Sequence, residues 1–517
     1  MNRPIRTIVI VGGGTAGWIA ANRIACELPT DGQDACEVVL VESPDVPAIG
    51  VGEGTWPSMR TTLQRIGVPE NEFLRTCDAS FKQGTCFLGW SSDDGAGVYY
   101  HPFSLPVEYT DLNPARYWLA ERPGTPFAEM VTPQTRAMAA GRAPRQVGAP
   151  EYAFSVNYGY HLDAGKFAAL LHRQAVRRFG VRHVVANVAG IATRADGDIA
   201  ALELDTGERL AGDLFVDCTG QRALLIGDHY GQRLASCRGT LFNDRAIVVQ
   251  VPYASPEDPI PSATRATATS AGWIWDIGLG TRRGLGHVHS SAHLDESDAR
   301  ATLRDYVRRS APEIDADALA YRTIAFEPGY RTEPWVRNCV AVGLSAGFVE
   351  PLEASALALV EQAAAMIGQQ FPRDRRIMDV VARRFNARMG YHWERVVEFL
   401  KLHYAVGDRD GRYWREHRAA DSCPEGLREK LALWEQQPPW HDDAPRVDEL
   451  FPSASYQYVL YGMGFRPRYT DAGTAPYDTG RRRADELFHD VRANADRMAR
   501  LLPTNRQLLC AIARRGA

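Results

Sequence analysis

A glycine-rich turn near the start of the chain, flanked by strand and helix patterns, most constrains the fold. Residues 7–11 form a β-branched run typical of a buried parallel strand. Residues 12–17 then fit the pattern G-x-G-x-x-G, and helical spacing of apolar residues runs over 16–28. A second buried strand is indicated over 37–41. The sequence therefore predicts a β-α-β unit that opens an α/β fold.

Such a turn suits the pyrophosphate of a dinucleotide. Glycines let the backbone approach the phosphates, and the following helix supplies unpaired amides and a partial positive charge. Glu42 ends the second strand, where a carboxylate is expected to bind a ribose hydroxyl. The predicted cofactor contacts in the turn are Gly12, Gly14, Thr15, Ala16 and Gly17.

Two later segments favour FAD over NAD as the dinucleotide. The run LFVDC at 214–218 leads into a Thr-Gly pair, and CVAVG at 339–343 leads into another glycine-containing turn. We find one full dinucleotide fingerprint, so we expect no separate nicotinamide site. The predicted architecture is a glutathione-reductase-like FAD-binding fold with an inserted substrate region and a mainly helical C-terminal part.

The predicted organisation has two parts. Residues 1–375 are assigned to the FAD-binding domain, with a Pro- and Gly-rich insertion around 93–148 and a substrate-side sheet around 240–330. Residues 376–517 are assigned to a mainly helical region that covers the substrate. Within the first part, we expect helices over 163–179 and 354–370 and strands over 184–188, 200–205 and 273–277.

Composition excludes several function classes. The net charge of −4 carries no electrostatic footprint for nucleic acid or an acidic membrane. The apolar run near the N-terminus is too short for a signal peptide, and no apolar stretch reaches the length of a membrane span. Nine cysteines lack metal-ligand spacing, so we expect free thiols, no metal and a cytoplasmic location.

Four segments carry a resemblance to a known family. They are GGGTAGW at 12–18, IGVGEGTWPSM at 49–59, GWIWDI at 272–277 and GFVEPLEAS at 347–355. Together they resemble the flavin-dependent tryptophan halogenases, and shorter matches extend the resemblance over most of the chain. The paired-Trp motif combined with Lys82 is specific to that family, whereas the glycine motif is not.

The resemblance implies two catalytic residues. Lys82 matches the family's catalytic lysine, which receives hypohalous acid made from reduced FAD, O2 and halide and directs it at an electron-rich arene. Desolvation would favour the neutral amine of such a lysine. Glu353 matches the active-site glutamate, which polarises the halogenating species or accepts the proton of the arenium ion. The alternative for Glu353 is an ordinary carboxylate in the first turn of a helix, stabilised by the helix dipole.

Further site residues follow from the same resemblance. The backbone amides of Ser355 and Ala356 match the halide-binding positions. Trp273 and Trp275 are expected to wall the tunnel between flavin and substrate, and His101 and Phe103 to line the indole pocket. Each also has a purely structural interpretation, as core tryptophans or as a structural histidine. Additional cofactor contacts are implied at Ile49, Val51, Glu53, Val188, Leu344, Ala356 and Leu357.

The sequence departs from the tryptophan-specific members near the C-terminus. Those enzymes hold the ammonium and carboxylate of tryptophan with an aromatic and acidic insertion, and residues 450–456 contain no equivalent. A free zwitterion would then leave its charges poorly paired. We therefore expect an indole or another electron-rich arene without that zwitterion, or an arene attached to a larger molecule, as substrate.

The implied enzyme is of the two-component kind. A separate NAD(P)H-dependent flavin reductase would supply FADH2 by diffusion, chloride or bromide would be the halide, and a homodimer is left open. Two alternatives remain at this point. One is a flavin monooxygenase that hydroxylates its substrate, which needs no lysine in a tunnel, and the other is a flavin-binding protein without catalytic activity.

Overall fold

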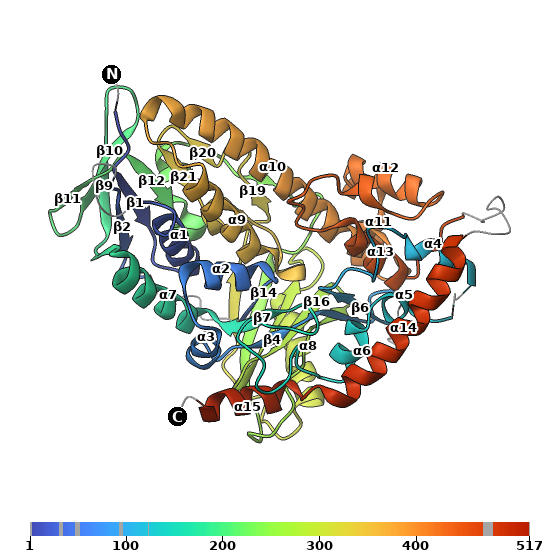
Figure 1. The fold of residues 1–517 in the computed structure, drawn as a ribbon. Helices are drawn as coiled ribbons and strands as arrows, with labels where there is room; N and C mark the ends of the chain where they lie inside the picture. Colours follow the sequence, from blue (N-terminus) through green and yellow to red (C-terminus); the bar gives the residue numbers. More distant parts are fainter. Residues whose placement is uncertain are drawn as a thin grey trace. The chain divides into compact units, whose positions relative to one another are not determined.

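The computed structural model describes residues 3–29, 35–46, 52–92, 97–121, 124–468 and 479–515 (Figure 1). The chain groups into two compact units, each built from three segments, so it passes between them five times. Unit 1 comprises Met1–Asp78, Leu162–Cys237 and Phe326–Glu394. Unit 2 comprises Ala79–His161, Arg238–Ala325 and Arg395–Ala517.

A six-stranded sheet forms the centre of unit 1, in the order β20-β21-β12-β1-β2-β8. All neighbours are parallel except β20 and β21. The strand bounds are β1 Thr7–Val11, β2 Glu37–Glu42, β8 Arg182–Val185, β12 Leu214–Asp217, β20 Trp335–Val336 and β21 Cys339–Ala341.

Both faces of this sheet are covered, which explains its continuous apolar strands. Val9, Val39 and Phe215 point into a core shared with the small sheet β9 (Val188–Thr193), β10 (Ile199–Leu204) and β11 (Arg209–Ala211). Because side chains alternate along a strand, Ile8 and Ile10 point to the other face. The helix α1 (Thr15–Ala25) packs against β1 and β2, as Figure 1 shows.

The remaining elements of unit 1 are mostly helical. α1 also packs against α7 and α9, and α2 packs against α9. The bounds are α2 Ser58–Ile66, α3 Glu70–Thr76, α7 Ala164–Phe179 and α9 Ser355–Gln369, with short strands β3 Gly52–Gly54, β13 Ala235–Ser236, β19 Gly329–Tyr330 and β22 Gly347–Phe348 and turns η1 Gly220–Arg222, η2 Leu224–His229, η3 Gly343–Ser345 and η4 Leu352–Ala354. The long helix α10 (Arg375–Ala405) continues from unit 1 into unit 2.

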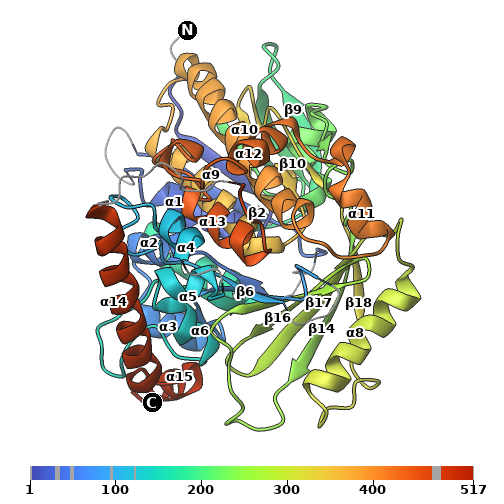
Figure 2. The same cartoon turned by 90° about the vertical axis from the view of Figure 1, so that its right-hand side faces the viewer.

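Unit 2 contains a seven-stranded sheet in the order β18-β14-β17-β16-β15-β5-β6. The helix α8 (Glu296–Ser310) lies along β14 and β17, as Figure 2 shows, and buries Ile274 of β16 together with Leu303 and Val307. The bounds are β5 Gly84–Leu88, β6 Val98–Pro102, β14 Arg245–Pro252, β15 Thr264–Thr269, β16 Gly272–Gly278, β17 Arg282–His289 and β18 Arg322–Ala325. A separate antiparallel pair joins β4 (Ser80–Lys82) to β7 (Gly159–Asp163), whose last two residues belong to unit 1.

The rest of unit 2 is helical, as expected for the C-terminal part. Among the described residues after 375, every regular element is a helix or a helical turn. α13 packs against β6 and α5, and α14 packs against α5 and α6. The bounds are α4 Pro114–Glu121, α5 Phe127–Val131, α6 Gln134–Ala139, α11 Arg412–Arg418, η5 Ala420–Ser422, α12 Glu425–Trp434, η6 His441–Asp443, α13 Ser453–Gly462, α14 Thr479–Leu501 and α15 Asn505–Arg515.

The structure confirms a mixed α/β fold with a helical C-terminal part, and it corrects one strand. Residues 184–188 do not form a single strand, because β8 ends at Val185 and β9 begins at Val188. The Ala186 amide donates a hydrogen bond to the Glu42 carbonyl, and the Asn187 amide donates one to the Asp205 carboxylate. The chain therefore passes from the sheet of β8 to the sheet of β9 at these two residues. The division into 1–375 and 376–517 stays a prediction.

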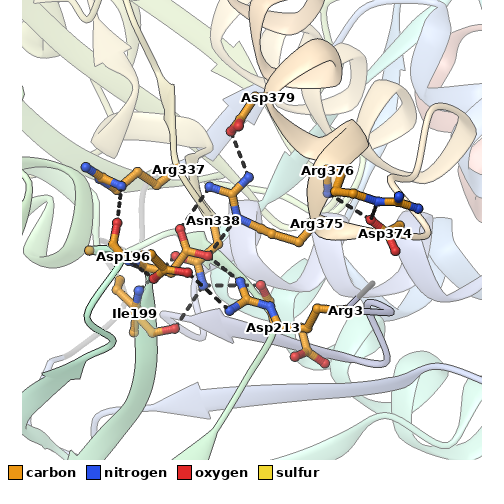
Figure 3. A network of polar contacts seen from close by, with 12 residues as sticks. Arg3, Asp196, Ile199, Asp213, Arg337, Asn338, Asp374, Arg375, Arg376 and Asp379 are labelled. Atoms are coloured by element: carbon orange, nitrogen blue, oxygen red, sulfur yellow. Dashed lines mark hydrogen bonds and ion pairs between the residues drawn. The ribbon is translucent and has the colours of Figure 1, made fainter. Parts of the chain in front are cut away.

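A network of polar contacts that includes Arg3, Asn338 and Arg375 links three distant segments of unit 1 (Figure 3). Asp198 is fully buried and accepts hydrogen bonds from Arg375 Nε at 2.7 Å and from Arg3. Arg375 also pairs with the exposed Asp379 at 2.8 Å. Asn338 donates to the carbonyl of Ile199 at 2.9 Å. The start of α10, the β9–β10 turn and the segment before β1 are thus held by one network.

No helix within the described ranges is long and apolar enough to cross a membrane. All nine cysteines are free thiols.

Candidate active site

The turn between β1 and α1 is closed on one side and open on the other. Gly12 has φ +113°, and a Cβ there would overlap the carbonyl of Cys218. A Cβ on Gly14 would meet nothing within 4 Å, and Gly14 is exposed. Gly14, the N-cap residue of α1, has no side chain to cap the first amides of the helix. These residues therefore fit a phosphate group.

A second glycine brings another predicted contact beside the turn. Gly343 has φ +78°, and a Cβ there would lie 2.7 Å from Cβ of Ala16 and 3.8 Å from Val360. The half-buried Leu344 follows it. Since Val360 is one turn along α9 from Ala356, the start of α1, η3 and the first turns of α9 lie together. The structure thus brings Thr15, Ala16, Leu344 and Ala356 to one region of unit 1.

The predicted ribose ligand lies next to the glycine turn. A Cβ on Gly13 would overlap the Glu42 side chain, and Glu42 Oε2 is 2.9 Å from His183 Nε2. Val188 begins the neighbouring strand β9 and is half-buried. His183 therefore fixes the orientation of Glu42 beside the glycine turn.

The carboxylate of Asp217, at the end of β12, binds backbone amides of the loop that follows this strand. It accepts hydrogen bonds from the amides of Thr219, Leu225 and Ile226 at 2.8–3.0 Å. It shapes the turn that carries the Cys218 carbonyl under Gly12. Strand β12 thus contributes to the site by holding the loop after it in a fixed conformation.

The chain is strained immediately before α9. Glu353 (φ 61°, ψ 4°) and Ala354 (φ 55°, ψ 42°) are two consecutive non-glycine residues in the left-handed region. Each such residue costs about 1–3 kcal/mol, and strain of this kind concentrates at functional sites. Trp56 Nε1 donates to the Glu353 carbonyl at 2.7 Å and helps to hold the conformation.

Because of this strained backbone, Glu353 lies before the start of α9 and not within that helix. Glu353 lies in η4 and is 5% exposed, while α9 begins only at Ser355. Glu353 therefore does not lie in the first turn of α9. Ser355, Ala356 and Leu357 supply the first amides of α9, which has no side-chain cap, and Ala356 is exposed. This helix start has the donors that an anion requires.

Glu53 is the one predicted cofactor residue with a strongly perturbed carboxyl group. It lies in β3 and is half-buried. Burial, and next the charge of Asp163, raise the pKa of Glu53 to about 7. Ile49 and Val51, also predicted as cofactor contacts, lie outside the described residues.

Lys82 is buried in unit 2, beside aromatic rings. It ends β4, is 1% exposed, and its Nζ lies 5.4 Å from the centroid of the Phe103 ring. The chain contains only four lysines. Lys166 and Lys430 pair with carboxylates, and Lys401 donates to Ser422 Oγ at 2.9 Å. Lysine is almost never fully buried unless its charge is paired, and an aromatic face within about 6 Å offers part of that compensation.

His101 lies in β6, a strand that packs against α13, and Phe103 follows directly after that strand. His101 Nε2 is 2.9 Å from Ser455 Oγ, and its ring is 6.0 Å from that of Tyr458. Tyr109 Oη lies 2.8 Å from Ser453 Oγ. The segment 450–456, which lacks the expected zwitterion-binding insertion, therefore meets this region with neutral hydroxyl groups.

Trp273 and Trp275 point to the face of β16 opposite Ile274. Trp273 is 1% exposed and packs 6.2 Å from Trp90, so it belongs to an aromatic core. Trp275 is half-buried and lies over Gly286 of β17, where a Cβ would overlap its ring. Gly286 thus makes the space that Trp275 occupies.

Two residues near the site were missed from sequence. His161 is fully buried on β7, and Gly286 accommodates Trp275. The alternation of residues 159–163 could have indicated a strand, but its pairing with Ser80–Lys82 is not visible in local sequence.

The fold and the glycine turn define a mixed α/β protein with a dinucleotide-type phosphate cradle. A model of the tryptophan halogenase family matches residues 7–478. The chain therefore belongs to the tryptophan halogenase family and is a flavin-dependent halogenase.

Individual relatives agree over the full length. Tryptophan 6-halogenase ThaL of Streptomyces albogriseolus is 32% identical, over 98% of this chain and 99% of ThaL. A tryptophan halogenase structure from Shewanella frigidimarina matches with a TM-score of 0.95 at 45% identity, over 99% of this chain and 98% of that one. The flavin-dependent halogenase BrvH from Brevundimonas sp. BAL3 matches with a TM-score of 0.85 at 32% identity, over 98% and 99% of the two chains.

Proposed function

We propose that this enzyme installs chlorine or bromine on an electron-rich, indole-like arene, using FAD supplied as FADH2. The observation that carries the proposal is Lys82, which is 1% exposed with its Nζ over the Phe103 ring. Burial of this kind disfavours the ammonium ion and protects a reactive amine from bulk water. The relatives named as halogenases support the reaction class.

Reduced flavin, when bound in a glutathione-reductase-like domain, would supply the electrons that let O2 oxidise halide to hypohalous acid. The protein would hold that flavin with Gly12, Gly14, Thr15, Ala16, Gly17, Glu42, Glu53, Val188, Leu344, Ala356 and Leu357. Halide would bind the amides of Ser355 and Ala356 at the uncapped start of α9. Trp273 and Trp275 would wall the passage between flavin and arene.

The halogenation step balances with two protein groups. Lys82 directs the halogen of hypohalous acid to the arene carbon, and the displaced hydroxide takes a proton from the Glu353 carboxyl group and leaves as water. Glu353 accepts the proton that the arene loses as the carbon–halogen bond forms. The strained backbone at Glu353 supports a role that fixes its carboxylate.

We propose a substrate without the free amino-acid zwitterion. Two side chains of α13 meet this region with neutral hydroxyl groups, Ser455 at His101 and Ser453 at Tyr109. Neutral hydroxyls would leave an ammonium and a carboxylate poorly compensated. Incubation with bromide and equal indole, phenol and tryptophan should give brominated indole or phenol in excess, read by mass spectrometry. Exclusive bromination of free tryptophan would contradict this.

The central test replaces Lys82 with alanine. K82A, given chemically reduced FAD, O2, bromide and indoles, should form no brominated product while still oxidising the flavin. The matched control is K166A, because the Lys166 side chain is 51% exposed and lies outside the proposed site. A hydroxylated product from either protein would instead identify a monooxygenase, and full bromination by K82A would overturn the proposal.

A separate NAD(P)H-dependent flavin reductase is the proposed source of FADH2, and cytoplasmic location and a homodimer remain predictions. If reduction occurs elsewhere, NADH and FAD alone should give no product. Addition of any diffusible flavin reductase should restore it.

A further inference from the structure

The turn before α9 contains two adjacent left-handed residues. Seven non-glycine residues within the described ranges have a positive φ, and Glu353 and Ala354 are the one neighbouring pair among them. A side chain disfavours this region, so such a residue persists only where its surroundings hold it. The contacts that hold this turn therefore decide where the Glu353 side chain points.

The peptide unit between Glu353 and Ala354 is held at both of its polar groups. Its carbonyl accepts a hydrogen bond from Trp56 Nε1 at 2.7 Å, and its amide donates to the carbonyl of Pro351 at 3.0 Å. Because a peptide unit is planar, these two bonds together fix ψ of Glu353 and φ of Ala354. Those two angles set the direction of the Glu353 side chain relative to α9.

Packing within unit 1 places Trp56 for this bond. Trp56 is half-buried and directly precedes Pro57, the cap of α2, and α2 packs against α9. The Trp56 carbonyl accepts a hydrogen bond from the amide of Met59 at 3.1 Å, and Met59 is fully buried. The indole N–H, which can only donate, is thus attached to the helix that packs beside the turn.

Another tryptophan of unit 1 makes the same kind of bond away from the proposed site. Trp335 Nε1 donates to the carbonyl of Arg337 at 3.2 Å, and Arg337 is left-handed with φ 54°. Trp335 lies two residues before its acceptor, whereas Trp56 and Glu353 are 297 residues apart. The pair of Trp335 and Arg337 therefore offers a matched structural control.

We propose that Trp56 is a positioning residue for Glu353. Its N–H holds the left-handed turn, and the turn fixes the direction of the Glu353 carboxyl group for proton transfer. This inference rests on the proposed function of Glu353 and adds to it the residue that acts through the backbone. Trp56 itself transfers no proton.

The first test replaces Trp56 with phenylalanine, which keeps an aromatic ring and removes the donor. We expect W56F to lower kcat for bromination of indole by about 3- to 10-fold, the worth of one hydrogen bond. The KM for bromide should not change, because the amides of Ser355 and Ala356 belong to α9. W335F should lose thermal stability and keep both kinetic values. A parental kcat in W56F would overturn the proposal.

The second test combines W56F with E353Q. Once residue 353 cannot transfer a proton, the direction of its side chain no longer affects the rate, so W56F should cost little in the E353Q background. If W56F lowers kcat by the same factor in both backgrounds, Trp56 acts elsewhere and the positioning role is wrong.

Hydrogen exchange provides a readout that needs no turnover. In protein without added flavin, W56F should speed exchange of the Ala354 amide by about 3- to 10-fold, because the turn opens more often. W335F should leave that amide unchanged and speed exchange around Arg337. Unchanged exchange at Ala354 in W56F would show that Trp56 does not hold the turn.

The outcomes distinguish this inference from the proposed function. Bromination at the parental rate by K82A or E353Q would end the proposed function, while the exchange experiment would still decide whether Trp56 holds the turn. If both variants are inactive and W56F has the parental kcat, the positioning role alone is wrong. Thermal melting of each variant identifies any loss that comes from unfolding.

Discussion

At the scale of single residues, a substitution at Gly14 should weaken cofactor binding without changing the stability of the protein. Its φ of −74° suits any residue, and a Cβ would meet nothing in the protein. We expect G14A to melt like the parent protein but to bind FAD at least several-fold more weakly, because the methyl group occupies the phosphate side. Differential scanning fluorimetry and a flavin titration measure the two effects.

The control is the first glycine of the same turn. G12A places a Cβ against the Cys218 carbonyl at φ +113°, so it should lose both stability and flavin binding. Unchanged flavin affinity in G14A would place the pyrophosphate elsewhere.

A second residue-scale prediction concerns Glu361, which is buried between α9 and α2. Burial raises the pKa of Glu361 to about 8, against the opposing effect of Ser58, Thr62 and Arg23. Its contribution to stability is complete below about pH 4.5 and is lost as the pH rises through 8. E361Q should match the parent protein at pH 5 and become more stable by up to a few kcal/mol at pH 8–9.

Urea denaturation across pH 5–9 measures this difference. A constant gap between E361Q and the parent at every pH would mean that the carboxyl group does not titrate in this range.

At the scale of elements, Gly286 of β17 leaves the space that the Trp275 ring of β16 occupies. G286A would push a Cβ into the Trp275 ring, and overpacking of this kind costs about 1–3 kcal/mol. We expect a lower melting temperature and altered tryptophan fluorescence. G284A is the control, since its Cβ would lie 3.3 Å from the movable Ile277 side chain and should be tolerated.

Local elements were predictable where the deciding interactions are local. The β1–α1–β2 unit and the start of α9 within one residue follow from periodicity and glycine chemistry. The break at 186–187 was not predictable, because it depends on Glu42 and Asp205 across the chain. The parallel pairing of β15 with β5 and the burial of Lys82 by β7 likewise arise from distant segments.

At the scale of the whole molecule, the Asp198 network links segments nearly 200 residues apart. Burial opposes ionisation of Asp198, but the hydrogen bonds from Arg375 and Arg3 lower its pKa. Removal of one partner from a buried pair costs about 3–5 kcal/mol. D198N should therefore lose roughly that much stability at pH 7, and the loss should shrink only below about pH 4.

Guanidinium denaturation checks this prediction, with D379N as its control. The Asp379 side chain is 57% exposed, and surface pairs contribute about 0–1 kcal/mol. Equal losses in D198N and D379N would contradict a dominant role for the buried carboxylate.

Because lysine is scarce in this protein, the products of amine labelling are few and easy to assign. An amine-reactive ester meets four side-chain targets, of which Lys166 is half exposed and Lys82 is shielded. Mild acylation should mark Lys166 long before Lys82. A halogen left on nitrogen after turnover without an arene would accordingly be traceable to a single peptide, and its isotope pattern would identify the halogen.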